Sequence, residues 1–366
     1  MFYNLLYPLH EQFQLFNLFQ YITVRAGGAL FTALVLSWLI GPGLIERFRS
    51  FQHKHKFKTV RDHMVAEHVV AKQGTPTMGG VLILGTLVTS TLLWADVTNA
   101  YVLVTLLVVL GFGIMGFIDD YLSVTGIRKG GMPGRLRLFI GATIAVTAAF
   151  VVQYIHQGPQ PHDLFVPYLK NVVLPLGLYG FLFFSALVVV GSANGVNLTD
   201  GLDGLATVPA MLVALSFAAI AYIVGRADFT GYLGVYYVPG VGELAVFCAA
   251  LVGACLGFLW FNAPPARIFM GDTGSLAMGA GLGIVAVMLK MEFVLAIVGG
   301  IFVLETLSVM LQVSYFKITK GKRLFKMAPL HHHFEKSGWA ESTIVIRFWI
   351  ISIVFALIGL SSLKLR

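Results

Sequence analysis

Charged residues are scarce in this chain. Asp, Glu, Lys and Arg make up 11% of the 366 residues and the mean hydropathy is +0.83, whereas a soluble domain carries about 25% charged residues. This composition excludes an ordinary soluble globular protein. Stretches of about 20 apolar residues fit a bilayer core, and ten occur, with approximate limits 22–45, 76–94, 101–118, 137–155, 172–190, 205–224, 244–261, 274–290, 293–314 and 343–363. We therefore expect an all-α polytopic membrane protein with about ten transmembrane helices, built as a single integral membrane domain over residues 1–366.

Cysteine is almost absent. Cys248 and Cys255 lie in one apolar stretch, and on a helix they are separated by about 10.5 Å of rise, which is too far for a disulfide. No Cys spacing typical of a metal site occurs. Lys and Arg are missing before Arg25, so the basic start of a signal peptide is lacking. The many Phe, Tyr and Leu residues of this first segment suit a position at the membrane interface.

Basic residues are unevenly distributed between the two sets of loops. The loops that follow the odd-numbered stretches hold 18 Lys or Arg residues, and the opposite side holds six. Because Lys and Arg favour the cytoplasmic side, we expect both termini to be periplasmic and the odd-numbered loops to be cytoplasmic. This topology and anionic lipid headgroups account for the net charge of +8, so no nucleic acid partner is expected. In the external loop 225–243 the pattern of Gly, Tyr and Val predicts a short hairpin.

Acidic residues are also few, with 17 in the chain. Five of them lie in three short Gly-rich segments that the charge pattern places on the cytoplasmic side: Asp119 and Asp120 in GFIDDY, Asp200 and Asp203 in NLTDGLDG, and Asp272 in RIFMGDTG. Carboxylates gathered in this way hold a hard cation against phosphate oxygens. The loops therefore predict a phosphate-handling site at one face of the membrane.

Asp119 and Asp120 end the third apolar stretch. The helix dipole disfavours acids near a helix C-terminus, so helix capping does not explain them. Adjacent helical residues point about 100° apart, which predicts different roles for the two carboxylates. Polarity at the membrane boundary is the alternative explanation.

Two further polar segments carry candidate ligands. Asn197, Asp200 and Asp203 have the spacing i, i+3, i+6 and share one face if the segment is a helical turn. A loop with a helix-capping Asp is the alternative. An EF-hand is excluded because its alternating ligands and distal Glu are missing. In NAPPARIFMGDTG, the amide of Asn262 can pair with a base or sugar and the ring of Phe269 can stack, whereas Asp272 is equally suited to cap the next helix.

The run MAPLHHHFE places His331, His332 and His333 on a long basic loop. Three consecutive His residues cannot easily face one zinc ion, and no usual partner spacing appears. Imidazoles that donate to phosphate or carry protons are more plausible. Glu305 and Gln312, seven residues apart in the ninth stretch, share a similar face. We expect Glu305 to form an interhelical hydrogen bond and Gln312 to reach the site.

Lys72, in AKQGTPTMGG before the second stretch, is another candidate to face phosphate, although a topological role explains it equally well. Five motifs, GTPTMGG, GFIDDY, NLTDGLDGL, FNAPPARIFMGDTGSLA and MAPLHHHFE, then occur in order over essentially the whole chain. Together they resemble the phospho-N-acetylmuramoyl-pentapeptide transferases of the polyprenyl-phosphate hexose-1-phosphate transferase superfamily. One departure is Ser123, where relatives often have Lys. Which of the basic residues Arg128, Lys129, Arg135 and Arg137 replaces that Lys stays open.

The resemblance implies transfer of phospho-N-acetylmuramoyl-pentapeptide from UDP-N-acetylmuramoyl-pentapeptide to undecaprenyl phosphate, giving lipid I and UMP with Mg²⁺, in the bacterial cytoplasmic (inner) membrane. It implies catalytic roles for Asp119, Asp120, Asp272, His331, His332 and His333, with the three aspartates at the metal. It implies substrate binding by Lys72, Asn197, Asp200, Gly201, Asp203, Asn262, Phe269 and Gln312. Whether the protein forms a homodimer stays open. A related N-acetylglucosamine-phosphate transferase is the nearest alternative. An ion-coupled transporter is the alternative from another class, but it predicts acids near mid-membrane.

Overall fold

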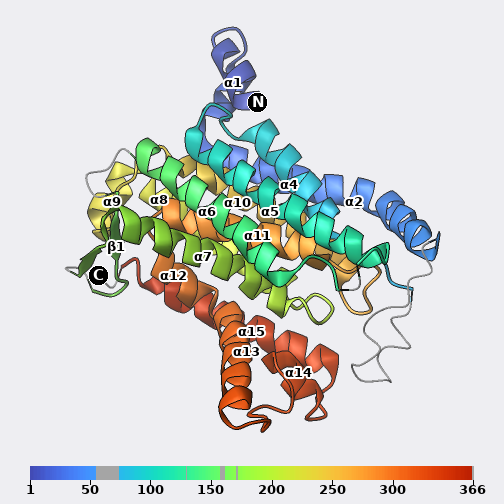
Figure 1. The fold of residues 1–366 in the computed structure, drawn as a ribbon. Helices are drawn as coiled ribbons and strands as arrows, with labels where there is room; N and C mark the ends of the chain where they lie inside the picture. The colour runs from blue at the N-terminus through green and yellow to red at the C-terminus, as the bar shows by residue number, and fades with distance from the viewer. Residues whose placement is uncertain (55–73, 129, 157–160, 170–171, 365–366) are drawn as a thin grey trace.

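The computed structural model describes residues 1–54, 74–128, 130–156, 161–169 and 172–364, and most of these residues are helical (Figure 1). The elements are α1 (Phe2–Leu6), η1 (Tyr7–Leu9), η2 (Gln14–Gln20), α2 (Ile22–Lys54), α4 (Gly80–Trp94), α5 (Ala100–Val124), α6 (Gly134–Ile155), β1 (Asp163–Phe165), β2 (Val173–Pro175), α7 (Gly177–Thr199), α8 (Thr207–Val224), α9 (Ala227–Leu233), η3 (Val241–Glu243), α10 (Leu244–Asn262), α11 (Gly271–Met288), α12 (Glu292–Val298), α13 (Gly300–Ile318), α14 (Leu330–Glu335) and α15 (Glu341–Ser361). Within the described ranges, nine helices are long and apolar enough to cross a membrane, and α4 is a shorter apolar helix of 15 residues. The expected all-α polytopic membrane fold is confirmed.

Each apolar stretch of the sequence coincides with a helix, but the stretch 293–314 is divided at Gly299 into α12 and α13. Two consecutive glycines lie at this break, and glycine weakens a helix interior. A Cβ added to Gly300 would lie 2.8 Å from the ring of Phe355, so close packing of α15 also requires glycine there. Beyond the break, α13 leaves the bundle and projects from it beside α14 (Figure 1).

The centre of the bundle is formed by α10 and α11. In their apolar windows 83% and 89% of the residues are buried, against 28% in α2 and α6, and a helix that is apolar on all sides belongs in such a core. Glycines let α2 approach α10 closely. A Cβ on Gly253 would lie 2.1 Å from the carbonyl oxygen of Leu30, and one on Gly257 would lie 2.3 Å from Cβ of Ser37. Small residues at helix contacts are the usual solution inside a membrane.

The bundle has two ends with different character. At one end α5 finishes and α11 begins, and we call it the aspartate end because Asp119, Asp120 and Asp272 lie there. Both chain termini lie at the other end. The amine of Met1 donates to the carbonyl oxygen of Leu92 at 2.7 Å, in the last turn of α4, and Nζ of Lys364 lies 3.8 Å from the ring centre of Tyr232 in α9. This arrangement matches the expectation that the two termini share a side.

The predicted hairpin in 225–243 is wrong. This segment contains α9 and η3 instead, and Gly234 ends α9 in the left-handed region at φ 71°, as helix C-terminal glycines commonly do. Val235, Val238 and Val241 are buried at intervals of three residues, which reflects packing on the bundle rather than the alternation of a strand. A two-stranded antiparallel sheet forms elsewhere at this end, where Asp163 pairs with Pro175 and Phe165 with Val173.

Candidate active site

The site is assembled from helix ends that lie far apart in the sequence. Asp119 and Asp120 lie near the end of α5, Asn197 lies in the last turn of α7, and Asp272 lies in the first turn of α11. The structure brings these four predicted residues together at the aspartate end, where they interact directly or through one neighbour. Lys72, also predicted from the sequence, lies outside the described residues.

Asp120 serves as the N-terminal cap of α11. One carboxylate oxygen accepts from the backbone N–H of Asp272 at 3.1 Å, and the other accepts from the N–H of Thr273 at 3.0 Å and its hydroxyl at 2.6 Å. These N–H groups have no partner inside their own helix. Gly271, at φ +74°, makes room, because a Cβ there would lie 2.6 Å from Oδ2 of Asp120. Asp120 therefore fixes the start of α11, and with it the position of Asp272.

The alternative role of Asp272 as an N-cap is wrong. The N-cap position of α11 belongs to Met270, which makes no side-chain cap bond. Instead the side chain of Asp272 points to other elements: Oδ2 accepts from Arg137 of α6 at 2.6 Å and Oδ1 accepts from Nδ2 of Asn197 at 2.7 Å. The carboxylate is 23% exposed, so a ligand can reach it.

Asp119 has different partners from Asp120, and its side chain interacts with the carboxyl group of Asp272. Its Oδ1 accepts from the backbone N–H of Met132 at 2.7 Å. Gly131, at φ +69°, packs against the same carboxylate, since a Cβ there would lie 2.5 Å from Oδ2 of Asp119. Asp119 and Asp272 are thus two adjacent carboxylates held from separate helices.

This pair fits a divalent cation. Two like charges side by side repel each other unless a cation lies nearby, and Arg137 supplies one such charge to Asp272. Mg²⁺ is usually held by one or two carboxylates together with water and substrate phosphates. Within the described residues no group of three or more His, Cys, Asp or Glu side chains is arranged to hold a metal. The donor set therefore suits a cation completed by a bound phosphate better than one enclosed by protein.

The helical turn that would place Asn197, Asp200 and Asp203 on one face does not form, because α7 ends at Thr199 and Asp200 is its C-cap with ψ 59°. The segment corresponds to the alternative, a loop with an Asp at a helix end. Asp203 is 3% exposed and turns inward, where its Oδ2 accepts from the N–H of Ala266 at 3.0 Å. The two glycines that follow Asp200 belong to the loop 200–206 and not to a helix. The regular spacing in the sequence thus coincides with the end of a helix.

Asn262 fastens the same loop to the bundle. Its Oδ1 accepts from the N–H of Gly204 at 3.0 Å and from Thr207 at 3.1 Å, and its Nδ2 donates to the carbonyl oxygen of Ile268 at 3.0 Å. The residue is 2% exposed, so its amide is engaged with protein groups. Phe269 is half-buried, and its backbone bonds both ways with the segment before α4, donating to Pro76 and accepting from Gly79 at 2.8 Å. The loops 200–206 and 263–270 therefore form one connected layer.

The three histidines lie in the first turn of α14, after Leu330, and have three different environments. His331 is fully buried and its Nδ1 lies 3.3 Å from Oε1 of Glu305. His332 is 17% exposed and its Nδ1 lies 2.5 Å from the carboxylate of Glu335. His333 accepts from the N–H of Lys326 at 3.1 Å through Nδ1, which orders the preceding loop. The side chains thus do not converge on one point.

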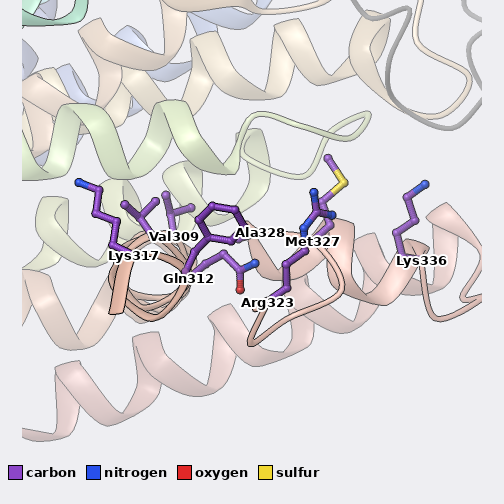
Figure 2. A pocket seen from close by; sticks show the side chains of 9 residues that line it. Val309, Gln312, Lys317, Arg323, Met327, Ala328 and Lys336 are labelled. Carbon is purple, nitrogen blue, oxygen red and sulfur yellow. The ribbon is translucent and has the colours of Figure 1, made fainter. Parts of the chain in front are cut away.

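Gln312 lines a cavity of about 530 Å³ between α13 and the loop that precedes α14 (Figure 2). Its Oε1 accepts from the N–H groups of Leu324 and Phe325 at 3.1 and 2.8 Å, so it also holds that loop to α13. The other lining residues combine apolar walls with three basic side chains: Val309, Val313, Phe316, Lys317, Arg323, Met327, Ala328 and Lys336. A cavity of this composition suits an anionic ligand with an apolar part.

The sequence left one contact of the site open and gave no sign of another. It grouped Arg137 with three other basic residues, and the structure selects it as the partner of Asp272. It did not find Glu341, whose Oε1 accepts from the N–H of Asp203 at 3.1 Å at the start of α15. Neither residue stands in a spacing that identifies its partner, because both contacts join segments more than 100 positions apart.

Comparison with known proteins agrees with this geometry. Residues 102–290 match glycosyl transferase family 4, and residues 72–84 match phospho-N-acetylmuramoyl-pentapeptide-transferase signature 1. The phospho-N-acetylmuramoyl-pentapeptide-transferase of Rickettsia rickettsii (strain Sheila Smith) is 56% identical over 366 residues, and that of Granulibacter bethesdensis is 55% identical, with all of each chain covered. The chain therefore belongs to the phospho-N-acetylmuramoyl-pentapeptide-transferase family of membrane enzymes.

Proposed function

We propose that this enzyme transfers phospho-N-acetylmuramoyl-pentapeptide from UDP-N-acetylmuramoyl-pentapeptide to undecaprenyl phosphate, giving lipid I and UMP. The observation that carries the proposal is the pair of adjacent carboxylates, Asp119 and Asp272, beside Arg137 at one end of a membrane bundle. A soluble nucleotide and a lipid phosphate can meet only at such an end. The relatives' names supply the identity of the transferred group.

The orientation follows from the charges. The loops at the aspartate end contain most of the Lys and Arg residues, which favour the cytoplasm. We therefore assign the aspartate end to the cytoplasm and both termini to the periplasm, with the whole chain 1–366 acting as a single membrane domain of the bacterial inner membrane. This orientation gives the site access to a nucleotide made in the cytoplasm.

Asp119 and Asp272 would hold Mg²⁺, which when bound offsets the negative charge of the diphosphate. Asp120 contributes indirectly, because its three hydrogen bonds fix the first turn of α11. The guanidinium of Arg137, now on Asp272, can pair bidentately with phosphate oxygens. Asn197 keeps the carboxylate of Asp272 oriented through its 2.7 Å bond.

The chemical step is an attack by an oxygen of the lipid phosphate on the sugar-linked phosphorus. The new P–O bond forms as the bond between the two phosphates breaks, and UMP leaves with that bridging oxygen. A phosphate monoester has its second pKa near 6, so the nucleophile is ionised at neutral pH and needs no strong base. Phosphoryl transfer then depends mainly on positioning and electrostatics. These considerations favour direct attack over a covalent intermediate.

The nucleotide would lie against the layer of loops 200–206 and 263–270, where Asp200, Gly201 and Phe269 are at least partly exposed. Asp203 and Asn262 are engaged inside this layer, so we assign them to shaping it. Of the histidines, His332 is the one paired with a carboxylate, Glu335, while remaining accessible. That arrangement orients an imidazole towards phosphate.

The test is release of UMP by the purified protein in the presence of Mg²⁺. With UDP-N-acetylmuramoyl-pentapeptide and undecaprenyl phosphate, UMP and a lipid-linked product should form in equal amounts. UDP-N-acetylglucosamine with the same lipid serves as the matched control and should give none. UMP release from the control substrate alone would instead make the chain an N-acetylglucosamine-phosphate transferase, and release from neither would refute the proposal.

A further inference from the structure

Glu305 is a fully buried carboxylate in a membrane-embedded helix. Burying such a charge is costly unless it receives hydrogen bonds. Its Oε2 accepts from the backbone N–H of Leu330 at 2.7 Å, and its Oε1 accepts from that of His331 at 3.2 Å. These are the first two residues of α14, whose N–H groups lack partners inside the helix, and the N-cap residue Pro329 offers no side-chain bond. Glu305 of α13 therefore replaces the missing cap of α14.

His331 extends this contact to another part of the chain. One side of its ring faces Glu305, with Nδ1 at 3.3 Å from Oε1. On the other side, a Cβ added to Gly201 would lie 2.1 Å from Nε2. The ring thus fills the space above Gly201, which belongs to the loop 200–206 beside Asp200. Three segments, α13, α14 and the loop after α7, are connected through one imidazole.

We infer that Glu305, His331 and Gly201 form a positioning contact that sets the His-rich helix α14 against the loop 200–206. The contact fixes two groups that the proposed function, on which this inference rests, places at the substrate: the accessible ring of His332, whose centre lies 4.2 Å from that of His331, and the loop with Asp200. His331 acts in this arrangement as a spacer, since it is fully buried. Glycine is required at position 201 because nothing larger fits beneath the ring.

The sharpest test is Gly201→Ala, because the backbone at 201 is not in the left-handed region and the three atoms nearest to the added Cβ all belong to the ring of His331. Real Cβ atoms essentially never approach closer than 3.0 Å, so the ring or the loop must shift by about 1 Å. A misplacement of about 1 Å costs on the order of 100-fold in rate. We expect that loss in kcat/KM, and about a 10-fold loss in UMP affinity by calorimetry.

The double variant Gly201→Ala/His331→Ala separates the contact from general damage. Truncating the imidazole removes the clash, so in thermal unfolding and UMP affinity the double variant should lose clearly less than the two single variants added together. Additive losses in both measurements would refute the contact. Coupled unfolding with unchanged UMP affinity in Gly201→Ala would refute the positioning role. Failure of the wild-type protein to bind UMP would point instead to the proposed function.

Glu305 is tested by a conservative and a disruptive change. Glu305→Gln keeps one of the two hydrogen bonds but places its NH₂ group against the other N–H, so UMP affinity should fall by about 3-fold. Glu305→Leu leaves both N–H groups unpaired and should lose about 10-fold or more. Leu307→Ala, at a position of α13 that is 45% exposed, is the matched control and should behave as wild type. Equal losses in the Gln and Leu variants, or none in Leu, would overturn the assignment.

Discussion

Replacing Asp119 or Asp120, which are adjacent near the end of α5, by asparagine should have different effects on the protein. Asp120 is 8% exposed and receives three hydrogen bonds from the first turn of α11. Asn offers one acceptor oxygen and places an NH₂ group against the other donors. We expect Asp120→Asn to lower the stability of the fold itself.

The magnitude follows from the contacts. Losing a hydrogen bond to a charged group costs about 1.5–3 kcal/mol, and losing the negative charge at the N-terminus of α11 adds about 0.3–1 kcal/mol. At about 2 °C per kcal/mol for a large chain, the apparent Tm of Asp120→Asn in detergent should fall by about 4–8 °C. Asp119→Asn keeps its bond from Met132, because Oδ1 of Asn accepts it equally, so its Tm should stay within about 1 °C of wild type.

Added Mg²⁺ should reverse the order of the two variants. A ligand that binds only the folded state raises Tm according to its affinity. Asp119 interacts with the side chain of Asp272, whereas the carboxylate of Asp120 is already bonded to the first turn of α11. Thermal unfolding with and without Mg²⁺ should therefore show stabilisation of wild type and of Asp120→Asn, and little of Asp119→Asn. Equal Tm losses without metal, or Mg²⁺ stabilisation of Asp119→Asn equal to wild type, would refute this division of roles.

Three further predictions concern other parts of the molecule. Arg137→Gln removes the cation that competes at Asp272, so in calorimetry without substrate Mg²⁺ should bind about 5-fold more tightly, while kcat/KM falls. Burial lowers the pKa of His156, just beyond α6, to about 4 from 6.5, so stability should decrease as the pH falls from about 6.5 towards 4, and in a pH series of unfolding curves His156→Phe should remove this loss. In a background in which the two buried cysteines are replaced by alanine, an impermeant thiol reagent added to intact cells should label Gly231→Cys and not Ser337→Cys. The reason is that the basic loops face the cytoplasm, and the reverse labelling would contradict the orientation.

The helices were predictable because a membrane span needs a long apolar stretch, and that signal is local in the sequence. The break at Gly299 was not predicted, since the residues on both sides are equally apolar and hydropathy does not register where a helix bends. The hairpin was predicted in the wrong loop because Gly, Tyr and Val residues are common in strands and turns. The buried residues Val235 and Val238 are three positions apart, whereas the residues on one face of a strand are two apart.

The sequence was sufficient to predict that carboxylates gather at the aspartate end, because carboxylates without nearby basic partners are rare in so apolar a chain. Their individual contacts were not. Asp120 caps a helix that begins 151 positions later, and Glu305 caps one that begins 25 positions later. Such caps depend on how helices pack, and a single sequence carries no spacing for them. The i, i+3, i+6 pattern of Asn197, Asp200 and Asp203 misled because the helix ends at Thr199.

The most direct test of the proposed site is to locate the divalent cation. Crystals grown with Mn²⁺ and UMP, measured at the manganese absorption edge, should give an anomalous peak at direct coordination distance, about 2.1 Å, from Asp272 and beside Asp119. Asp120 should remain bonded to Asp272 and Thr273 at the start of α11. A peak coordinated by Asp120 or by the histidines of α14, with none at Asp272, would contradict the account.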